Sequence, residues 1–308
     1  MIAESADLLA SPWRFQAHVE VWLLVAALVA SWIYAVRVLG PRLAPAEPAV
    51  SVRQRGAFVA AVLILWLASD WPIHDISEEY LYSVHMFQHM AVAYFVPPLV
   101  LLATPEWLFR ALVGNGVLAR AVRWMGRPVP AGLTFNVVVM ITHIPALVNR
   151  SVTNGPLHYA LHVAVVVSAL FMWMPVCGPD PSLHVGWGGR MIYLFLMSVV
   201  PTVPAGWLTF AEGIVYRHYD IPVRVWGLSA TIDQQLAGAI MKVGGGIFLW
   251  TIIGTMFFRR FAASFGREQS YLRTDSTAVG SSMPDTLTYE HVTDAFGRVP
   301  PAPEPPRR

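Results

Sequence analysis

Residues 84–103 read VHMFQHMAVAYFVPPLVLLA, and this stretch decides the fold class. It contains no Asp, Glu, Lys or Arg, and it is as long as the roughly 20 residues that an α-helix needs to cross a bilayer core. Lipid offers no hydrogen bonds to an exposed backbone, so a segment that crosses it is expected to be helical. The sequence therefore predicts a transmembrane helix here, with His85 and His89 in its first half.

Apolar stretches of similar length recur along most of the chain. The sequence predicts seven spans, at about 18–39, 56–73, 84–103, 131–149, 157–177, 190–210 and 229–258. The strands of a membrane barrel would be shorter and would alternate in polarity, which these stretches do not. We therefore predict an all-α, polytopic membrane helix bundle with seven transmembrane helices.

Composition supports a protein that uses lipid as part of its solvent. Hydrophobic residues are 56% of the 308 residues and charged residues only 13%, whereas soluble domains average about 25% charged residues. The net charge of +2 gives no reason to expect a nucleic-acid partner. The single cysteine, Cys177, excludes an internal disulfide and any site built from several thiolates.

The arginines in the connections predict the orientation, because basic residues collect on the cytoplasmic side. One side carries Arg37, Arg42, Arg53, Arg55, Arg110, Arg120, Arg123, Arg127, Arg190, Arg259, Arg260, Arg267 and Arg273. The other side carries Arg14, Arg150, Arg217 and Arg224, together with the acidic residues Asp70, Asp75, Glu78 and Glu79. We therefore expect the N-terminus outside and the C-terminus in the cytoplasm.

The chain divides into a membrane domain and a polar extension. We predict a seven-helix transmembrane domain over 1–258 and a disordered cytoplasmic tail over 259–308, because the tail ends in PPAPEPPRR and cannot form a packed core.

Histidines collect at the predicted outer end of the bundle. They are His18, His74, His85, His89, His143, His158, His162 and His218. His85 and His89 are four residues apart, as are His158 and His162, so each pair shares one helix face. Together with His143 on a third helix, the two pairs predict one polar cluster inside the membrane, where polar side chains tend to mark function.

Imidazoles at this spacing can bind one metal ion. Met86 and Met90 each follow a histidine of the first pair, and thioether with imidazole suits copper, especially Cu(I). The predicted metal ligands are thus His85, His89, His143, His158 and His162, with Met86 and Met90. The alternative to metal binding is that the histidines make buried hydrogen bonds and that the methionines pack against neighbouring helices. The acidic segment 75–79 either recruits metal or is simply solvated.

Further polar and helix-breaking residues lie at membrane depth. Asp233 and Gln234 open the last span, where Asp233 either orients a ligand imidazole as an outer partner or caps a helix N-terminus. Pro97, Pro145 and Pro201 would interrupt their spans. Broken helices at membrane depth are tolerated beside protein or a cavity, so we expect a pocket that opens outward.

At these residues the sequence resembles the CtaG-type family of seven-span cytochrome c oxidase assembly factors. The matching segments are HMFQH (85–89), PP (97–98), ATP (103–105), THIP (142–145), His158 with His162, WMP (173–175), DQQLAG (233–238) and IM (240–241). They cover about residues 55–258 in this order. Lys242 stands where many relatives have an aromatic residue.

The resemblance implies a bacterial plasma-membrane protein that helps to build haem-copper oxidases, and that is tied to copper delivery. The implied partners are cytochrome c oxidase subunits, and a soluble copper donor on the outer face is left open. Hand-over by ligand exchange involves no covalent chemistry, so we do not expect an enzyme.

Three alternatives remain at this stage. The first is a b-type cytochrome, with His89 and either His158 or His162 as axial haem ligands. The second is a retinal protein on Lys242, and the third is a copper permease.

Overall fold

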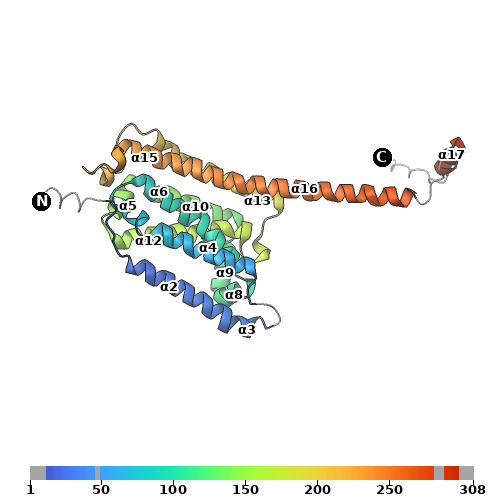
Figure 1. The fold of residues 1–308 in the computed structure, drawn as a ribbon, viewed down its shortest axis with the longest axis horizontal. Helices are drawn as coiled ribbons and strands as arrows, with labels where there is room; N and C mark the ends of the chain where they lie inside the picture. Colours follow the sequence, from blue (N-terminus) through green and yellow to red (C-terminus); the bar gives the residue numbers. More distant parts are fainter. Residues whose placement is uncertain (1–11, 46–48, 281–287, 298–308) are drawn as a thin grey trace. The chain divides into compact units, whose positions relative to one another are not determined.

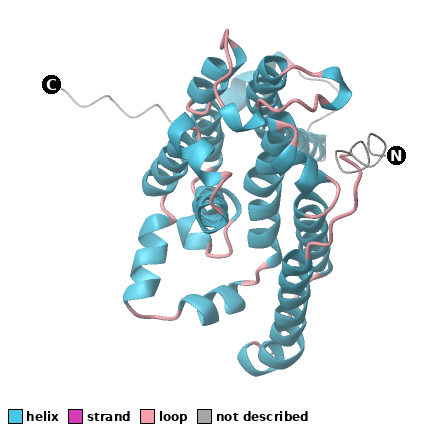
Figure 2. Ribbon diagram, turned by 90° about the vertical axis from the view of Figure 1, so that its left-hand side faces the viewer, coloured by secondary structure: helices cyan, strands magenta, loops and turns pink. Residues whose placement is uncertain are grey.

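The protein is helical throughout the part of the chain described in this computed structural model, which covers residues 12–45, 49–280 and 288–297. No strand occurs in those residues (Figures 1 and 2). Six helices are long and apolar enough to cross a membrane, or seven when a bent pair is counted as one span. The predicted all-α membrane bundle is confirmed, while the direction of the termini stays a prediction.

The first six observed spans agree with the predicted ones to within a few residues, and the last continues in α16 beyond the predicted end at 258. The observed spans are α2 (Val19–Tyr34) with η1 (Ala35–Leu39) and α3 (Gly40–Leu43); α4 (Val52–Ser69); α6 (Tyr82–Met90) with η2 (Ala91–Phe95) and α7 (Val96–Ala103); α10 (Pro128–Thr142) with α11 (Pro145–Ser151); α12 (Gly155–Cys177); α13 (Trp187–Val199) with α14 (Thr202–Thr209); and α15 (Ala230–Ala239) with η6 (Ile240–Gly244) and α16 (Gly245–Gly280). The connections contain α5 (Ile73–Glu79), α8 (Glu106–Val113), α9 (Val117–Met125) and the short 3-10 turns η3 (Pro181–Leu183), η4 (Arg217–Tyr219) and η5 (Val225–Gly227).

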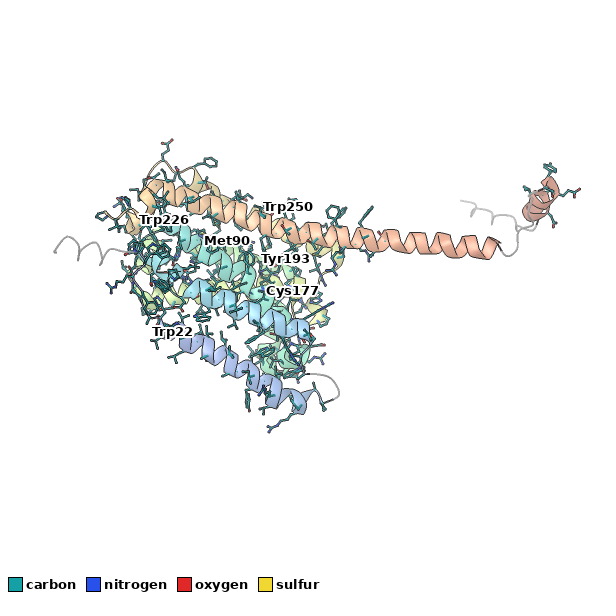
Figure 3. The ribbon with its side chains drawn as sticks, viewed as in Figure 1. Trp22, Met90, Cys177, Tyr193, Trp226 and Trp250 are labelled. Atoms are coloured by element: carbon teal, nitrogen blue, oxygen red, sulfur yellow. The ribbon has the colours of Figure 1, made fainter. Side chains whose placement is uncertain are left out.

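The span from α6 to α7 forms the centre of the bundle. It packs against α4, α12 and α15, and 61% of its most apolar stretch is buried, against 6% for α2. Met90 and Tyr193 are buried, whereas Trp22 and Trp250 lie on the outside of the bundle (Figure 3). The central span is thus the one whose polar side chains are shielded most completely from lipid.

Helix breaks occur where proline removes a backbone donor, as predicted. The fourth span bends by 73° between α10 and α11, just before Pro145. The sixth span breaks at Pro201, and the third widens into a π-helical turn, η2, ahead of Pro97. Such breaks place irregular backbone next to the polar cluster described below.

Lys242 lies on the exposed side of η6 and makes hydrogen bonds to the sixth span where that span is broken. Its ammonium group donates to the Thr202 hydroxyl at 2.6 Å and to the carbonyl of Ser198 at 3.3 Å. It therefore points away from the bundle interior and offers no retinal site.

Residues from Gly254 onward form a second compact unit. Among the described residues of this part, α16 remains helical to Gly280 and α17 covers Tyr289–Gly297, while the predicted disordered tail over 259–308 stays a prediction. No proline interrupts 259–280, so nothing stops the last span from continuing as a helix. The Pro-rich end, 298–308, lies outside the described residues.

Candidate metal site

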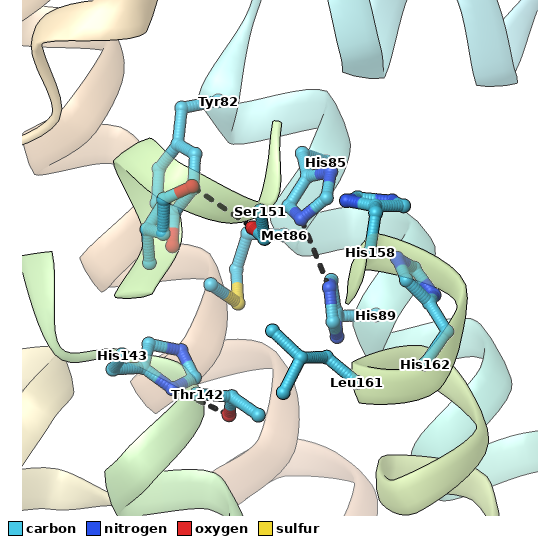
Figure 4. Close-up of a pocket in the computed structure, with 11 residues that line it drawn as sticks. Tyr82, His85, Met86, His89, Thr142, His143, Ser151, His158, Leu161 and His162 are labelled. Carbon is cyan, nitrogen blue, oxygen red and sulfur yellow. Dashed lines mark hydrogen bonds between the residues drawn. The ribbon is translucent and has the colours of Figure 1, made fainter. Parts of the chain in front are cut away.

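Four histidines from two neighbouring helices face one another, as the spacing predicts. His85 and His89 lie on α6, and His158 and His162 lie near the start of α12. The ring of His162 is 4.6 Å from that of His89 and 5.8 Å from that of His85, between ring centres (Figure 4). The two pairs thus form a single cluster across the helix interface.

Glu78 completes this cluster from the connection before α6. It sits near the end of α5, which packs against α6. Its Oε1 atom is 3.0 Å from His158 Nε2 and 3.5 Å from His85 Nδ1. Burial acts to raise the pKa of Glu78, but the approach of His158 and His85 outweighs it and holds the pKa well below its usual range. A negative charge is therefore held against the imidazoles.

No pattern in the sequence distinguishes Glu78 from the other acidic residues of its segment. The helix is interrupted between α5, which ends at Glu79, and α6, which begins at Tyr82. Helical periodicity therefore does not relate the position of Glu78 to that of His85. Only its place in the same outer connection signalled a role.

Several candidate ligand atoms in the cluster are buried and make no hydrogen bond to a residue outside the cluster. They are Glu78 Oε1, His85 Nδ1, His158 Nε2 and His162 Nε2. Buried polar atoms in folded proteins are nearly always hydrogen-bonded, so a group of buried ligand atoms that face only one another needs an explanation. Ligand atoms of His85, His89 and His162 lie within 4.8 Å of one another, and so do those of Glu78, His158 and His162. This donor set fits a metal cation.

His143 approaches from a third helix end and completes the cavity wall. Its Nδ1 lies 2.7 Å from the carbonyl of Val139, which can only accept, so Nδ1 carries the proton. Nε2 is then an unprotonated acceptor, and it is buried without a partner. A hydrogen bond that orients one ring nitrogen is typical of histidines that ligate metal through the other.

A cavity of about 30 Å³ lies between these side chains (Figure 4). It is lined by Tyr82, His85, Met86, His89, Thr142, His143, Val148, Ser151, His158, Leu161 and His162. The volume suits one ion or water molecule. A porphyrin is far larger, so the geometry disfavours the b-type cytochrome.

Methionines line two adjoining cavities, and Met86 borders both of them. Met86 is 2% exposed and its sulfur points into the histidine cavity (Figure 4). Met90 lines a deeper, more apolar cavity with Met241, and His89 and His143 border both cavities. Met241 was not among the predicted ligands, because a methionine in a span usually packs against its neighbours.

The side chains of Asp233 and Gln234 accept hydrogen bonds from backbone N–H groups of segments that adjoin the cluster. Asp233 accepts hydrogen bonds from the N–H groups of Tyr82 at 2.7 Å and Ser83 at 3.0 Å, so it caps α6. Gln234 accepts from Val215 and Tyr216 N–H groups, and the Tyr216 hydroxyl donates to the carbonyl of His143. The capping alternative therefore holds for Asp233, although the capped helix is α6 and not its own.

Fold and site together define a polytopic helical membrane protein with a buried histidine and carboxylate cluster near one end of the bundle. The family model described as cytochrome c oxidase caa3 assembly factor (Caa3_CtaG) matches residues 30–263. This is most of the chain and includes every residue of the cluster, so the protein belongs to this family. No curated protein and no solved structure matches the chain. The resemblance noted in the sequence is thus confirmed.

Proposed function

We propose that the protein holds copper in this cluster and passes it to the oxidase during assembly. The observation that carries the proposal is the group of buried ligand atoms on Glu78, His85, His158 and His162, which face one another and make no hydrogen bond outside the cluster. Membership of the oxidase assembly family supports copper as the cargo, because such oxidases contain copper centres.

The chemistry of the donors supports copper further. Imidazole and thioether ligands favour copper over hard cations, which prefer several oxygen ligands. His85, His89, His143, His158 and His162 would supply nitrogen, and Met86 and Met90 would supply sulfur. Asp233 and Gln234 would keep α6 and His143 in place through the contacts described above.

Copper would be released by ligand exchange, in which side chains of the oxidase subunits replace those of the cluster around the ion. No covalent bond is made or broken, so no catalytic step is needed. We place the protein in the bacterial plasma membrane with the cluster toward the outer face, where a soluble donor could supply the metal.

The test is copper retention after purification in detergent under reducing conditions. Replacing both His85 and His89 with Ala is expected to abolish near-stoichiometric copper binding while membrane insertion is retained. The matched control is His184→Ala, which removes an imidazole bonded to the carbonyl of Gly178, outside the cluster. Normal copper loading of the double variant, or failure of the wild-type protein to take up Cu(I) on titration, would overturn the proposal. A visible spectrum of the same samples checks for haem.

A further inference from the structure

The cluster contains two groups of ligands that differ in chemistry and share one residue. The outer group is Glu78, His158 and His162, and the inner group is His85, His89 and His162. Glu78 is the most accessible of the side chains that meet at this point, with 22% of it exposed, against 12% for His158 and 9% for His85. A cation arriving from the accessible side therefore meets the group with the carboxylate first.

The two groups favour different cations. A carboxylate supplies a full negative charge, which offsets the charge of a divalent ion in a poorly solvated place, and with two imidazoles it suits Zn(II) or Cu(II). The inner group is neutral and borders Met86, whose sulfur points into the same cavity (Figure 4). Imidazole with thioether suits Cu(I), which brings one charge less.

The contacts inside the two groups differ as well. In the outer group, Glu78 Oε1 lies 3.0 Å from His158 Nε2, and His162 Nε2 is buried without a hydrogen-bond partner. In the inner group, Nε2 of His85 and Nε2 of His89 are 2.9 Å apart, so one of them donates a proton to the other. A cation that enters the outer group takes the place of the contact between Glu78 and His158, whereas a cation in the inner group must displace the hydrogen bond between two imidazoles and its proton.

We infer that the cluster is two adjacent, mutually exclusive cation positions: an outer divalent position at Glu78, His158 and His162, and an inner Cu(I) position at His85, His89 and His162 with Met86. They exclude each other because both require His162. The inference rests on the proposed function for metal binding itself, and adds Glu78 as a ligand and a second class of cation. No electron transfer between the two positions is part of it.

The test titrates the full-length protein in detergent with two probes, Zn(II) and Cu(I), the latter kept reduced and buffered by a competing chelator. Glu78→Gln, which preserves side-chain shape, is expected to weaken Zn(II) binding by at least about tenfold and to change Cu(I) binding by less than about threefold. Met86→Leu is expected to do the reverse. Glu79→Gln is the matched control, because Glu79 lies next to Glu78 but is exposed and bonded to Gln16.

Competition separates the remaining outcomes. Cu(I) added to Zn(II)-loaded protein is expected to release the zinc. Retention of both metals together, or equal losses for both probes in Glu78→Gln, would overturn the two-position arrangement and leave the proposed function standing. A wild-type protein that binds neither probe would overturn both. Unchanged thermal unfolding of Glu78→Gln shows that its effect is local.

Discussion

Two polar clusters lie near the same end of the bundle and differ in how their hydrogen bonds are satisfied. The ligand cluster consists of Glu78, His85, His89, His158 and His162. The anchor cluster consists of His18, His74, Asp75, Ser77 and Gln88. In the anchor cluster, His18 Nε2 lies 2.6 Å from Asp75 Oδ1, and the Gln88 side chain joins His74 Nδ1 to the Ser77 hydroxyl. One oxygen of Asp75 is its unpaired buried atom.

The difference separates a structural role from a binding role. α2 buries none of its residues, so apolar packing holds it weakly, and polar contacts at its start connect it to α5. The indole of Trp22 donates to Asp70 at the end of α4, which adds a second polar attachment for α2. In the anchor cluster one histidine and one carboxylate join two helices, whereas in the ligand cluster three or more donors lie within 4.8 Å of one another, as a bound cation requires.

The largest expected contrast comes from removing one histidine from each cluster. His162→Ala removes the residue that both cation positions require, so we expect Zn(II) and Cu(I) binding to weaken by on the order of 100-fold or more. His18→Ala should leave metal binding intact and lower the free energy of unfolding by about 3 kcal/mol, because the buried Asp75 carboxylate loses its partner. Metal titration and thermal unfolding in detergent measure the two effects. A His18→Ala variant with lost metal binding and unchanged stability would remove the distinction between the clusters.

A smaller effect is expected from the cap that positions the ligand cluster. Asp233→Ala leaves the buried N–H groups of Tyr82 and Ser83 without acceptors, so we expect a loss of about 2 kcal/mol in the free energy of unfolding and weaker metal binding. Ser229→Ala is the control, because Ser229 caps α15 with one exposed hydrogen bond to Ile232. Its loss should be about 1 kcal/mol or less, with metal binding unchanged. Equal losses of unfolding free energy in the two variants would show that Asp233 stabilises α6 no more than an ordinary exposed helix cap does.

The smallest expected effect is a pH dependence within the anchor cluster. Burial lowers the pKa of His74 below its ordinary value of 6.5, with His18 and His158 adding to the shift and Glu78 and Asp75 opposing it. The unfolded chain then binds a proton more readily than the folded one, so this contribution to stability is present above pH 6.5 and declines as the pH falls toward the folded pKa. Between pH 6.5 and 5.5 the decline is at most about 1.4 kcal/mol.

Comparison with His74→Asn isolates this contribution from other titrating groups. The wild-type protein should lose more stability than the variant between pH 7.5 and 5.5, as measured by thermal unfolding in detergent. Identical slopes for the two proteins would show that His74 takes no part in the pH dependence.

Glu78 and His143 show where sequence reasoning stops. The histidine pairs were predictable because a regular helix fixes which residues share a face. Glu78 lies beyond a break in the helix, and its distance from His158 depends on how α5 folds back on α6. His143 was predicted as a ligand, yet it lies outside both close groups and borders the cavity from the end of α10.

The sequence by itself determined the membrane class, the spans and the two histidine pairs, because apolar length and helical period are local properties of the chain. The tertiary structure decided that Glu78 joins the imidazoles, that Asp233 caps α6, and which nitrogens remain unpaired. These features depend on contacts between residues as far apart as Tyr82 and Asp233, whose distance is set by helix packing and not by any local pattern.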